Sequence, residues 1–589
     1  MTIAAGTPGL ETSVGNFALI DTLREWGIVH YAGVNGGGII HTTKYLLPMT
    51  EMSHITDGVP RMLTMGEYAS GFVPMGYYLA SGRVGCCFTT TGAATKLGAS
   101  GITEAKVHDI PSLYLLALNS TTSIGDSPLQ DVSEHGMHIV PQLQAEIGEA
   151  CIVIDNHNRL EEDLIKAQSF LHKKRPVVIA FHPDVLSREI EINVPKKEKT
   201  RTYNKADVER FIADFPEMAK GRRVIIYVGE EAAFYPNIQE LSTELSVLLK
   251  APTIWSMNGA NAVAPDNPYG YGYIMMGGNE KSMELWSEMD PEEDLCITLG
   301  FCAGEYSINL EKIKAKCTWH FGEHVEGYGH VNGDFSHRCA GEYRQVRGDI
   351  SLTLQEVISQ LKAMGVDKDR PEVPTYDDLN DREIWRDVRK DCVDFVAFYE
   401  ELPKYWQPNS IGFDDVCISY KDRQYVTQRP HPYIPFWSGH HGSAMGGAFG
   451  MGVGAKMGDP SLHTFIFSGD GCWRLFGGCL ADAAWMDLRL FIINNGTYGI
   501  VDKGLELIIP TVEKPRYHSK LPNIDFVQAA KAHGWDGYNV KPDLSNLKEI
   551  MEACYETKGQ SILIEIPVDT EQVVGLNARL LNLSTDFYL

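Results

Sequence analysis

The stretch that decides the fold runs from Phe465 to Ile500 and reads FIFSGDGCWRLFGGCLADAAWMDLRLFIINNGTYGI. Phe465-Ile466-Phe467 is a short apolar run that predicts a buried strand. Cys472 to Met486 is long enough for a helix, and Leu488 to Ile493 predicts a second buried strand. In such a β-α-β unit the strands are parallel, so the loops that follow them meet at the same edge of the sheet. The sequence therefore predicts an α/β fold with a ligand site at that edge.

Both of these loops carry side chains suited to a metal ion. Gly469-Asp470-Gly471 follows the first predicted strand, and Asn494-Asn495 follows the second. The glycines permit a tight turn and a close approach of the backbone to a ligand. Mg²⁺ prefers oxygen ligands and often shares its shell with phosphate groups. Either motif alone is common in surface turns, but the two together between apolar strands predict a Mg²⁺-diphosphate site.

Alternating helical and apolar stretches divide the chain into three blocks. We expect each block to form a doubly wound parallel sheet, with domains at residues 1–188, 205–366 and 383–570, joined by the polar stretches KKEKTRTYNK and DKDRPEVPTYDDLNDRE. The first and third blocks end alike, in VVIAFHPD and ILIEIPVD, which suggests two related domains around a different one, although two buried strands can resemble each other by chance. Residues 571–589 form a tail that either packs over the site or frays.

Composition excludes several classes of function. The chain has 589 residues and a formal net charge of −25, which disfavours nucleic acid and anionic membranes as partners. No segment is long and apolar enough to span a membrane, and MTIAAGTPGLETS does not resemble a signal peptide. The twelve cysteines form no CxxC pair and mostly lie in apolar segments, so reduced, buried thiols and a cytoplasmic location are expected.

The GDG and NN loops resemble the metal motif of the thiamin-diphosphate (ThDP) enzyme superfamily, in the group of acetolactate (acetohydroxyacid) synthases, pyruvate oxidases and 2-oxo acid decarboxylases. The resemblance implies ThDP and Mg²⁺ as cofactors, with Asp470, Asn495 and the backbone carbonyl of Thr497 as metal ligands. It also implies that the three blocks are pyrimidine-binding, central and diphosphate-binding domains. The interval between the motifs is about two residues shorter than in the synthase branch, a length that the helix-to-strand connection tolerates.

A second segment resembles the pyrimidine-binding domain of the same superfamily. Glu67 opens a predicted helix, and Thr91-Gly92-Ala93-Ala94-Thr95 matches a conserved loop, shortened and without its proline. By itself, Glu67 is an ordinary acidic residue in the first turn of a helix. The resemblance implies instead that it is the general acid/base that hydrogen-bonds the pyrimidine and so promotes loss of the thiazolium proton. In that family the two motifs of one active site come from different subunits, which implies a homodimer or homotetramer.

Further residues that contact the cofactor follow from the same resemblance. Met445 occupies the place of the bulky residue beneath the thiazolium ring, although methionine is also a common gap-filler in cores. The remaining residues that we predict to contact the cofactor are Asn35, Gly36, Thr91, Ser443, Gly469, Gly471, Cys472 and Tyr498.

The reaction pocket is less firmly defined. Gln130 matches a residue of synthases and oxidases, and Gly37 stands where decarboxylases carry an acidic residue. His440 and His441 are candidates for the pocket, with structural roles as the alternative. The stretch TWHFGEHVEGYGHVNG replaces the segment at which the relatives bind FAD, so FAD is not expected.

Together these features predict C–C bond cleavage and formation on a small-molecule 2-oxo acid. We expect decarboxylative carboligation with a carbonyl acceptor, as in acetolactate synthesis. Non-oxidative decarboxylation to an aldehyde is the second alternative. An oxidative or hydrolytic reaction of the 2-oxo acid is the third. A non-catalytic ThDP-binding regulatory or structural subunit is the alternative of another class, against which the retention of Glu67, Asp470 and Asn495 argues.

Overall fold

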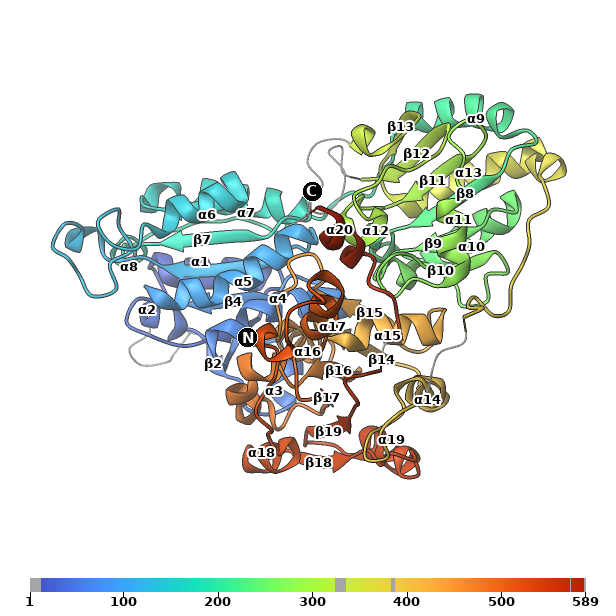
Figure 1. Cartoon of the computed structure of the whole chain (residues 1–589). Helices are drawn as coiled ribbons and strands as arrows, with labels where there is room; N and C mark the ends of the chain where they lie inside the picture. The colour runs from blue at the N-terminus through green and yellow to red at the C-terminus, as the bar shows by residue number, and fades with distance from the viewer. Residues whose placement is uncertain (1–11, 324–334, 383–386, 573, 587–589) are drawn as a thin grey trace.

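A computed structural model describes residues 12–323, 335–382, 387–572 and 574–586. The first eleven residues, the 324–334 part of the stretch that argued against FAD, and the predicted start of the third domain at 383 lie outside the described residues. Three α/β domains follow one another along the chain, coloured blue to cyan, green to yellow, and orange to red in Figure 1. Every strand pair in the three sheets is parallel, which confirms the predicted fold class.

The first sheet contains seven strands. Across the sheet they are β2 (Leu47–Pro48), β3 (Arg61–Thr64), β1 (His30–Gly33), β4 (Cys86–Thr89), β5 (Leu113–Ala117), β7 (Val177–Phe181) and β6 (Cys151–Ile154). Its main helices are α1 (Gly15–Glu25), α4 (Glu67–Ser81), α5 (Ala93–Val107), α6 (Ile139–Ile147) and α7 (Leu160–His172).

The third sheet contains six strands. They are, in order, β15 (Phe436–Ser438), β14 (Ser410–Asp414), β16 (His463–Gly469), β17 (Leu488–Asn494), β19 (Ile562–Pro567) and β18 (Asp536–Asn539). Its helices are α14 (Phe395–Glu401), α15 (Ile418–Thr427), α16 (Gly447–Gly458), α17 (Gly499–Ile508), α18 (Phe526–Ala532) and α19 (Leu547–Glu556).

Apart from the short edge strand β2, the first and third sheets have the same strand order. Numbered as each domain supplies them, without β2, both read 2-1-3-4-6-5, and β7 and β19, the two strands whose sequences resemble each other, occupy the same place. The shared strand order agrees with the suggestion that two related domains flank a different one. The middle sheet reads 3-2-1-4-5-6, the order of dinucleotide-binding sheets. It is built from β10 (Gly270–Tyr273), β9 (Thr253–Trp255), β8 (Val224–Val228), β11 (Leu295–Leu299), β12 (Cys317–Gly322) and β13 (Glu342–Arg347).

Two equivalent helices join the related domains. α4 follows β3 in the first domain, α16 follows β15 in the third, and the two helices pack against each other. Glycines allow the contact, because a Cβ at Gly454 would collide with the carbonyl oxygen of Val73, and one at Gly76 with that of Met451. The small residues at 446–454 thus serve the packing of α16 against α4.

One predicted element is wrong. Residues 472–486 form two short 3₁₀ segments, Cys472–Leu475 and Gly477–Ala483, and not one α-helix. The adjacent glycines Gly477 and Gly478 weaken a helix at this point. The indole of Trp473 also lies against Gly477, where a Cβ would be only 2.7 Å from the ring. The flanking strands β16 and β17 are as predicted.

All twelve cysteines are free thiols, and ten of them are buried. Within the described parts of the chain, no helix is long and apolar enough to cross a membrane.

Candidate cofactor and metal site

Asp470 lies at the carboxyl end of β16 and is buried. Its carboxylate accepts hydrogen bonds from the backbone N–H of Gly471 at 3.0 Å and of Gly496 at 2.8 Å. The second contact joins the loop after β16 to the loop after β17, as the two parallel strands predict. Burial raises the pKa of Asp470 to about 6, and these backbone N–H groups only partly offset the effect. A cation beside this carboxylate would relieve the cost of its burial.

The loop after β17 supplies further oxygen atoms. The side-chain oxygen of Asn495 accepts from the backbone N–H of Thr497 at 3.2 Å, and Thr497 Oγ1 donates to the carbonyl oxygen of Ser519. Asp470, Asn495 and Thr497 all line one pocket of about 130 Å³. Carboxylate, amide and carbonyl oxygens form a donor set that suits Mg²⁺.

The same pocket is shaped to admit a diphosphate. Gly469, Gly471, Cys472, Tyr498 and Met445 also line it. A Cβ at Gly471 would stand 2.5 Å from the ring of Tyr498, so only glycine leaves room here. The residues predicted from the GDG and NN motifs are thus brought together, and they fit a metal-bound diphosphate.

Asp415, which the motif analysis missed, holds the Met445 loop in place. It follows β14 and accepts hydrogen bonds from Gly446 N–H at 2.8 Å and from Ser468 Oγ at 2.6 Å. Burial raises its pKa to about 6. The polar pair Asp414-Asp415, directly after the apolar stretch Ile411-Gly412-Phe413, was the available signal. Ser443 turns away from the pocket, since its Oγ donates to the carbonyl oxygen of His440 and lies 3.1 Å from the hydroxyl of Tyr306 in the middle domain.

The predicted residues of the first domain gather at the carboxyl edge of its sheet. Asn35 and Gly36 follow β1, and Thr91 follows β4. Gln130 reaches the same loops, because a Cβ at Gly92 would lie 2.7 Å from the Gln130 side chain. Residues from three distant stretches of sequence therefore lie together at this edge.

Glu67 is the first residue of α4, at the same edge, and is half-buried. Its neighbour Tyr68 donates a hydrogen bond to the backbone carbonyl of Met445. The start of α4 and the loop before α16 are therefore in contact within one chain. The described residues that line the Asp470 pocket nevertheless all belong to the third domain, so Glu67 of the same chain does not line it.

Comparison with known proteins agrees with this geometry. A model of the thiamine pyrophosphate enzyme N-terminal TPP binding domain matches residues 14–140, and one of the C-terminal TPP binding domain matches residues 417–566. The chain belongs to the ThDP-dependent enzyme superfamily. Glu67 lies within the first match, and Asp470 and Asn495 lie within the second. The middle domain, with its different strand order, lies between the two matches.

Relatives align along nearly the whole chain of this ThDP-dependent enzyme. An acetolactate synthase of Mycobacterium avium is 22% identical, over 98% of this chain and 90% of its own. The large subunit of acetolactate synthase isozyme 1 of Escherichia coli is 22% identical, over 94% of both chains. A probable acetolactate synthase large subunit of Methanococcus aeolicus is 23% identical, over 97% and 95%. These relatives place the enzyme in the acetolactate synthase group.

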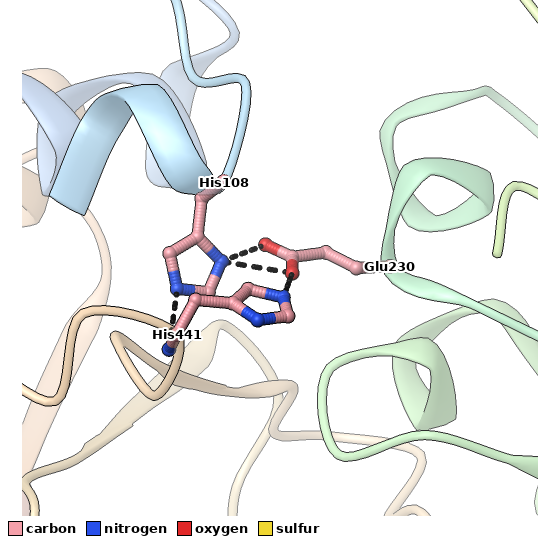
Figure 2. A group of neighbouring side chains, drawn as sticks. All are labelled: His108, Glu230 and His441. Atoms are coloured by element: carbon pink, nitrogen blue, oxygen red, sulfur yellow. Dashed lines mark hydrogen bonds and ion pairs between the residues drawn. The ribbon is translucent and has the colours of Figure 1, made fainter. Parts of the chain in front are cut away.

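The two candidate histidines do not line the Asp470 pocket. His440 Nδ1 lies 3.1 Å from the carbonyl oxygen of Ser438, and the ring of His440 is close to those of His441 and Tyr306. His441 joins a buried cluster with His108 and Glu230, shown in Figure 2. Their roles in the reaction stay predictions.

A larger cavity adjoins the metal pocket of this ThDP-dependent enzyme. It has a volume of about 420 Å³ and shares Ile418, Asn495, Gly499 and Ile500 with the pocket of Asp470. Tail residues 575–578 and Leu580 form one wall, and helix α20 (Arg579–Asp586) packs against α17. The described part of the tail therefore packs beside the site.

Proposed function

We propose that the chain is a ThDP- and Mg²⁺-dependent carboligase that acts on a 2-oxo acid and a carbonyl acceptor. One observation carries the proposal. The carboxyl edges of two sheets with the same strand order carry the predicted site residues, with Glu67 on one edge and Asp470 with Asn495 on the other.

In this proposal each edge binds one part of the cofactor. Asp470, Asn495 and the carbonyl of Thr497 hold Mg²⁺ on the diphosphate, and Met445 supports the thiazolium ring. Asn35, Gly36 and Thr91 contact the pyrimidine side, and Ser443 lies on the loop that carries Met445. When bound, ThDP supplies a nucleophilic carbon that adds to the keto group and stabilises the negative charge left by loss of CO₂.

Glu67 holds a proton at the pyrimidine ring nitrogen and thereby acts as the general acid/base. Since the described residues that line the Asp470 pocket all come from the third domain, we infer that a second copy of the chain supplies Glu67 to each site. We therefore propose a homodimer or homotetramer with the active site at the interface.

Three features favour ligation over simple release of an aldehyde. Gly37 offers no acid to protonate the product, Gln130 lies beside the Thr91 loop, and the relatives that align over the chain are acetolactate synthases. The adjoining cavity gives an acceptor room next to Asn495. Lys421 and Lys503 lie in its wall, but both are paired with acidic side chains, so they leave the substrate's charge undetermined.

The test is reconstitution with ThDP and Mg²⁺ against a panel of 2-oxo acids, with and without a second keto acid or an aldehyde. Carboligation predicts CO₂ release together with product masses equal to donor plus acceptor minus CO₂. Aldehyde as the main product would favour the decarboxylase, and cofactor binding without turnover would favour the non-catalytic subunit. The visible spectrum of the purified protein tests the expectation that FAD is not bound.

A further inference from the structure

A second polar cluster lies at the junction of the three domains. His108 caps the carboxyl end of α5 in the first domain, and Glu230 begins the 3₁₀ segment Glu230–Phe234 in the middle domain. His441 lies in the third domain, on the loop that leads to Met445 (Figure 2). The side chains of His108, Glu230 and His441 are 1%, 4% and 3% exposed. Three domains thus each contribute one potential metal ligand to a site closed to solvent.

The spacing of these atoms suits a tetrahedral ion. His108 Nδ1 lies 2.9 Å from both carboxylate oxygens of Glu230, and His441 Nε2 lies 3.8 Å from Glu230 Oε2. One atom from each of the three residues lies within 4.8 Å of the others. Zinc with bonds of about 2.0–2.1 Å keeps its ligand atoms about 3.3 Å apart. The two separations bracket that value, so small side-chain shifts are enough to admit an ion.

Glu104 contacts the other ring nitrogen of His108. Its carboxylate lies 3.1 Å from His108 Nε2 and accepts from the backbone N–H of Gly442 at 2.9 Å. A histidine that binds a metal through one ring nitrogen usually donates its other N–H to a carboxylate. Glu104 therefore holds His108 with its Nδ1 toward Glu230.

The cluster also carries excess negative charge. Within the described part of the chain, the ion pairs of Glu104 and Glu230 are with histidines and none is with lysine or arginine. With neutral histidines, two ionised carboxylates here would leave two buried negative charges that the described ion pairs do not balance. A divalent ion with neutral histidines balances both carboxylates.

We propose that His108, Glu230 and His441 bind a divalent transition-metal ion of the zinc class, with Glu104 orienting His108. The ion is distinct from the proposed Mg²⁺, whose oxygen ligands follow β16 and β17. It fastens the three domains to one another and fixes the loop from Gly439 to Gly446, which carries Met445. The proposal does not depend on the reaction assigned above.

The experiment is metal analysis of the full-length protein, purified without chelator and then incubated with Zn²⁺ and desalted. We expect about one zinc per chain in the wild type and in D470N, and its loss in H441N. H135N is the matched control, since His135 is exposed, and it should keep the metal. E104Q should weaken zinc binding by about 10–100-fold.

A second readout guards against misfolding of H441N. Co²⁺ added to the wild-type protein should give the visible absorption of a tetrahedral site, and Zn²⁺ should abolish it. Wild-type protein that retains no Zn²⁺ or Co²⁺ would overturn the proposal in favour of a metal-free ionic cluster around protonated His108. Full retention of zinc by folded H441N would also overturn it.

Discussion

The first and third domains share a strand order but carry different chemistry at the same places. The loop after β4 is Thr90-Thr91-Gly92, whereas the loop after the equivalent strand β16 is Asp470-Gly471-Cys472. The start of α4 carries Glu67, whereas the residue before the start of α16 is Gly446, preceded by Met445. In the proposed function the sheet therefore fixes where the cofactor binds, and a few loop residues decide whether that edge supplies a proton or metal ligands.

The largest expected effect comes from D470N. It removes the only carboxylate of the proposed metal site, so Mg²⁺-dependent ThDP binding should weaken by more than about 100-fold, beyond the usual loss for an outer-shell partner. Turnover should fall with it. Calorimetric titration of ThDP with and without Mg²⁺ measures the change. D543N, on an exposed residue of the same domain, is the control, and unchanged binding in D470N would break the assignment of metal chemistry to the third domain.

E67Q should separate catalysis from binding. Glutamine keeps the size of the side chain but cannot exchange the proton, so turnover should fall by about 10²–10⁴-fold. ThDP affinity should stay within a few-fold of wild type, because the metal site lies on the other domain. Steady-state rates and ThDP titration give both numbers, with E161Q on exposed Glu161 as control. Unchanged turnover would remove Glu67 from its proposed role.

The parts of the fold that the sequence predicted are those that depend on short-range pattern. Apolar runs such as Phe465–Phe467 and Leu488–Ile493 predict central strands, and the similar ends of the first and third blocks suggest that these domains are related. The Asp470 and Asn495 motifs meet because parallel strands place their loops together. Between the two motifs, however, two 3₁₀ segments take the place of the expected helix, with Trp473 packed against Gly477. The hydrophobic periodicity of the sequence does not predict this packing.

The three-domain cluster depends on long-range packing. His108 and Glu230 are 122 residues apart, and neither lies in a motif that predicts a metal site. His441 was a candidate only through its nearness to Met445. Which ring nitrogen faces which carboxylate depends on how three separate domains dock, and local propensity does not encode that. Formation of a homodimer depends likewise on how two chains pack together, so it stays a prediction.

The contact between α4 and α16 gives a smaller effect, on stability, and tests how closely the first and third domains pack. In G454A the new Cβ collides with the backbone carbonyl of Val73, and overpacking of this kind costs about 1–3 kcal/mol. The cost should exceed the gain of about 1 kcal/mol from the better helix propensity of alanine. Thermal unfolding measures the difference. In G478A the Cβ meets nothing within 4 Å, so this variant is the control, and equal melting temperatures would show that the helices are not held this closely.

Lys456 distinguishes the two helices and should give the smallest effect. It lies in the last turn of α16, whereas the last turn of α4 has no basic residue. Lys456 is buried, and its Nζ donates to the carbonyl oxygen of Leu462 at 2.7 Å. Burial lowers the pKa of Lys456 to about 8. Below that pH the folded protein carries a buried charge, which destabilises it relative to the unfolded chain.

The sign of the pH dependence follows from this lowered pKa. Below about pH 8 the native protein must bury a charge that the unfolded chain solvates freely, and the cost shrinks as pH rises from 8 toward the unfolded value near 10.4. K456M escapes this cost but loses a hydrogen bond, so its net gain in stability at pH 7 should be on the order of 1 kcal/mol. The gain should narrow as pH rises above 8. Unfolding curves of wild type and K456M at pH 7 and 9.5 measure the change in stability. K548M, on an exposed lysine, is the control. A gain that does not change with pH would mean that packing, and not the buried charge, sets α16 apart from α4.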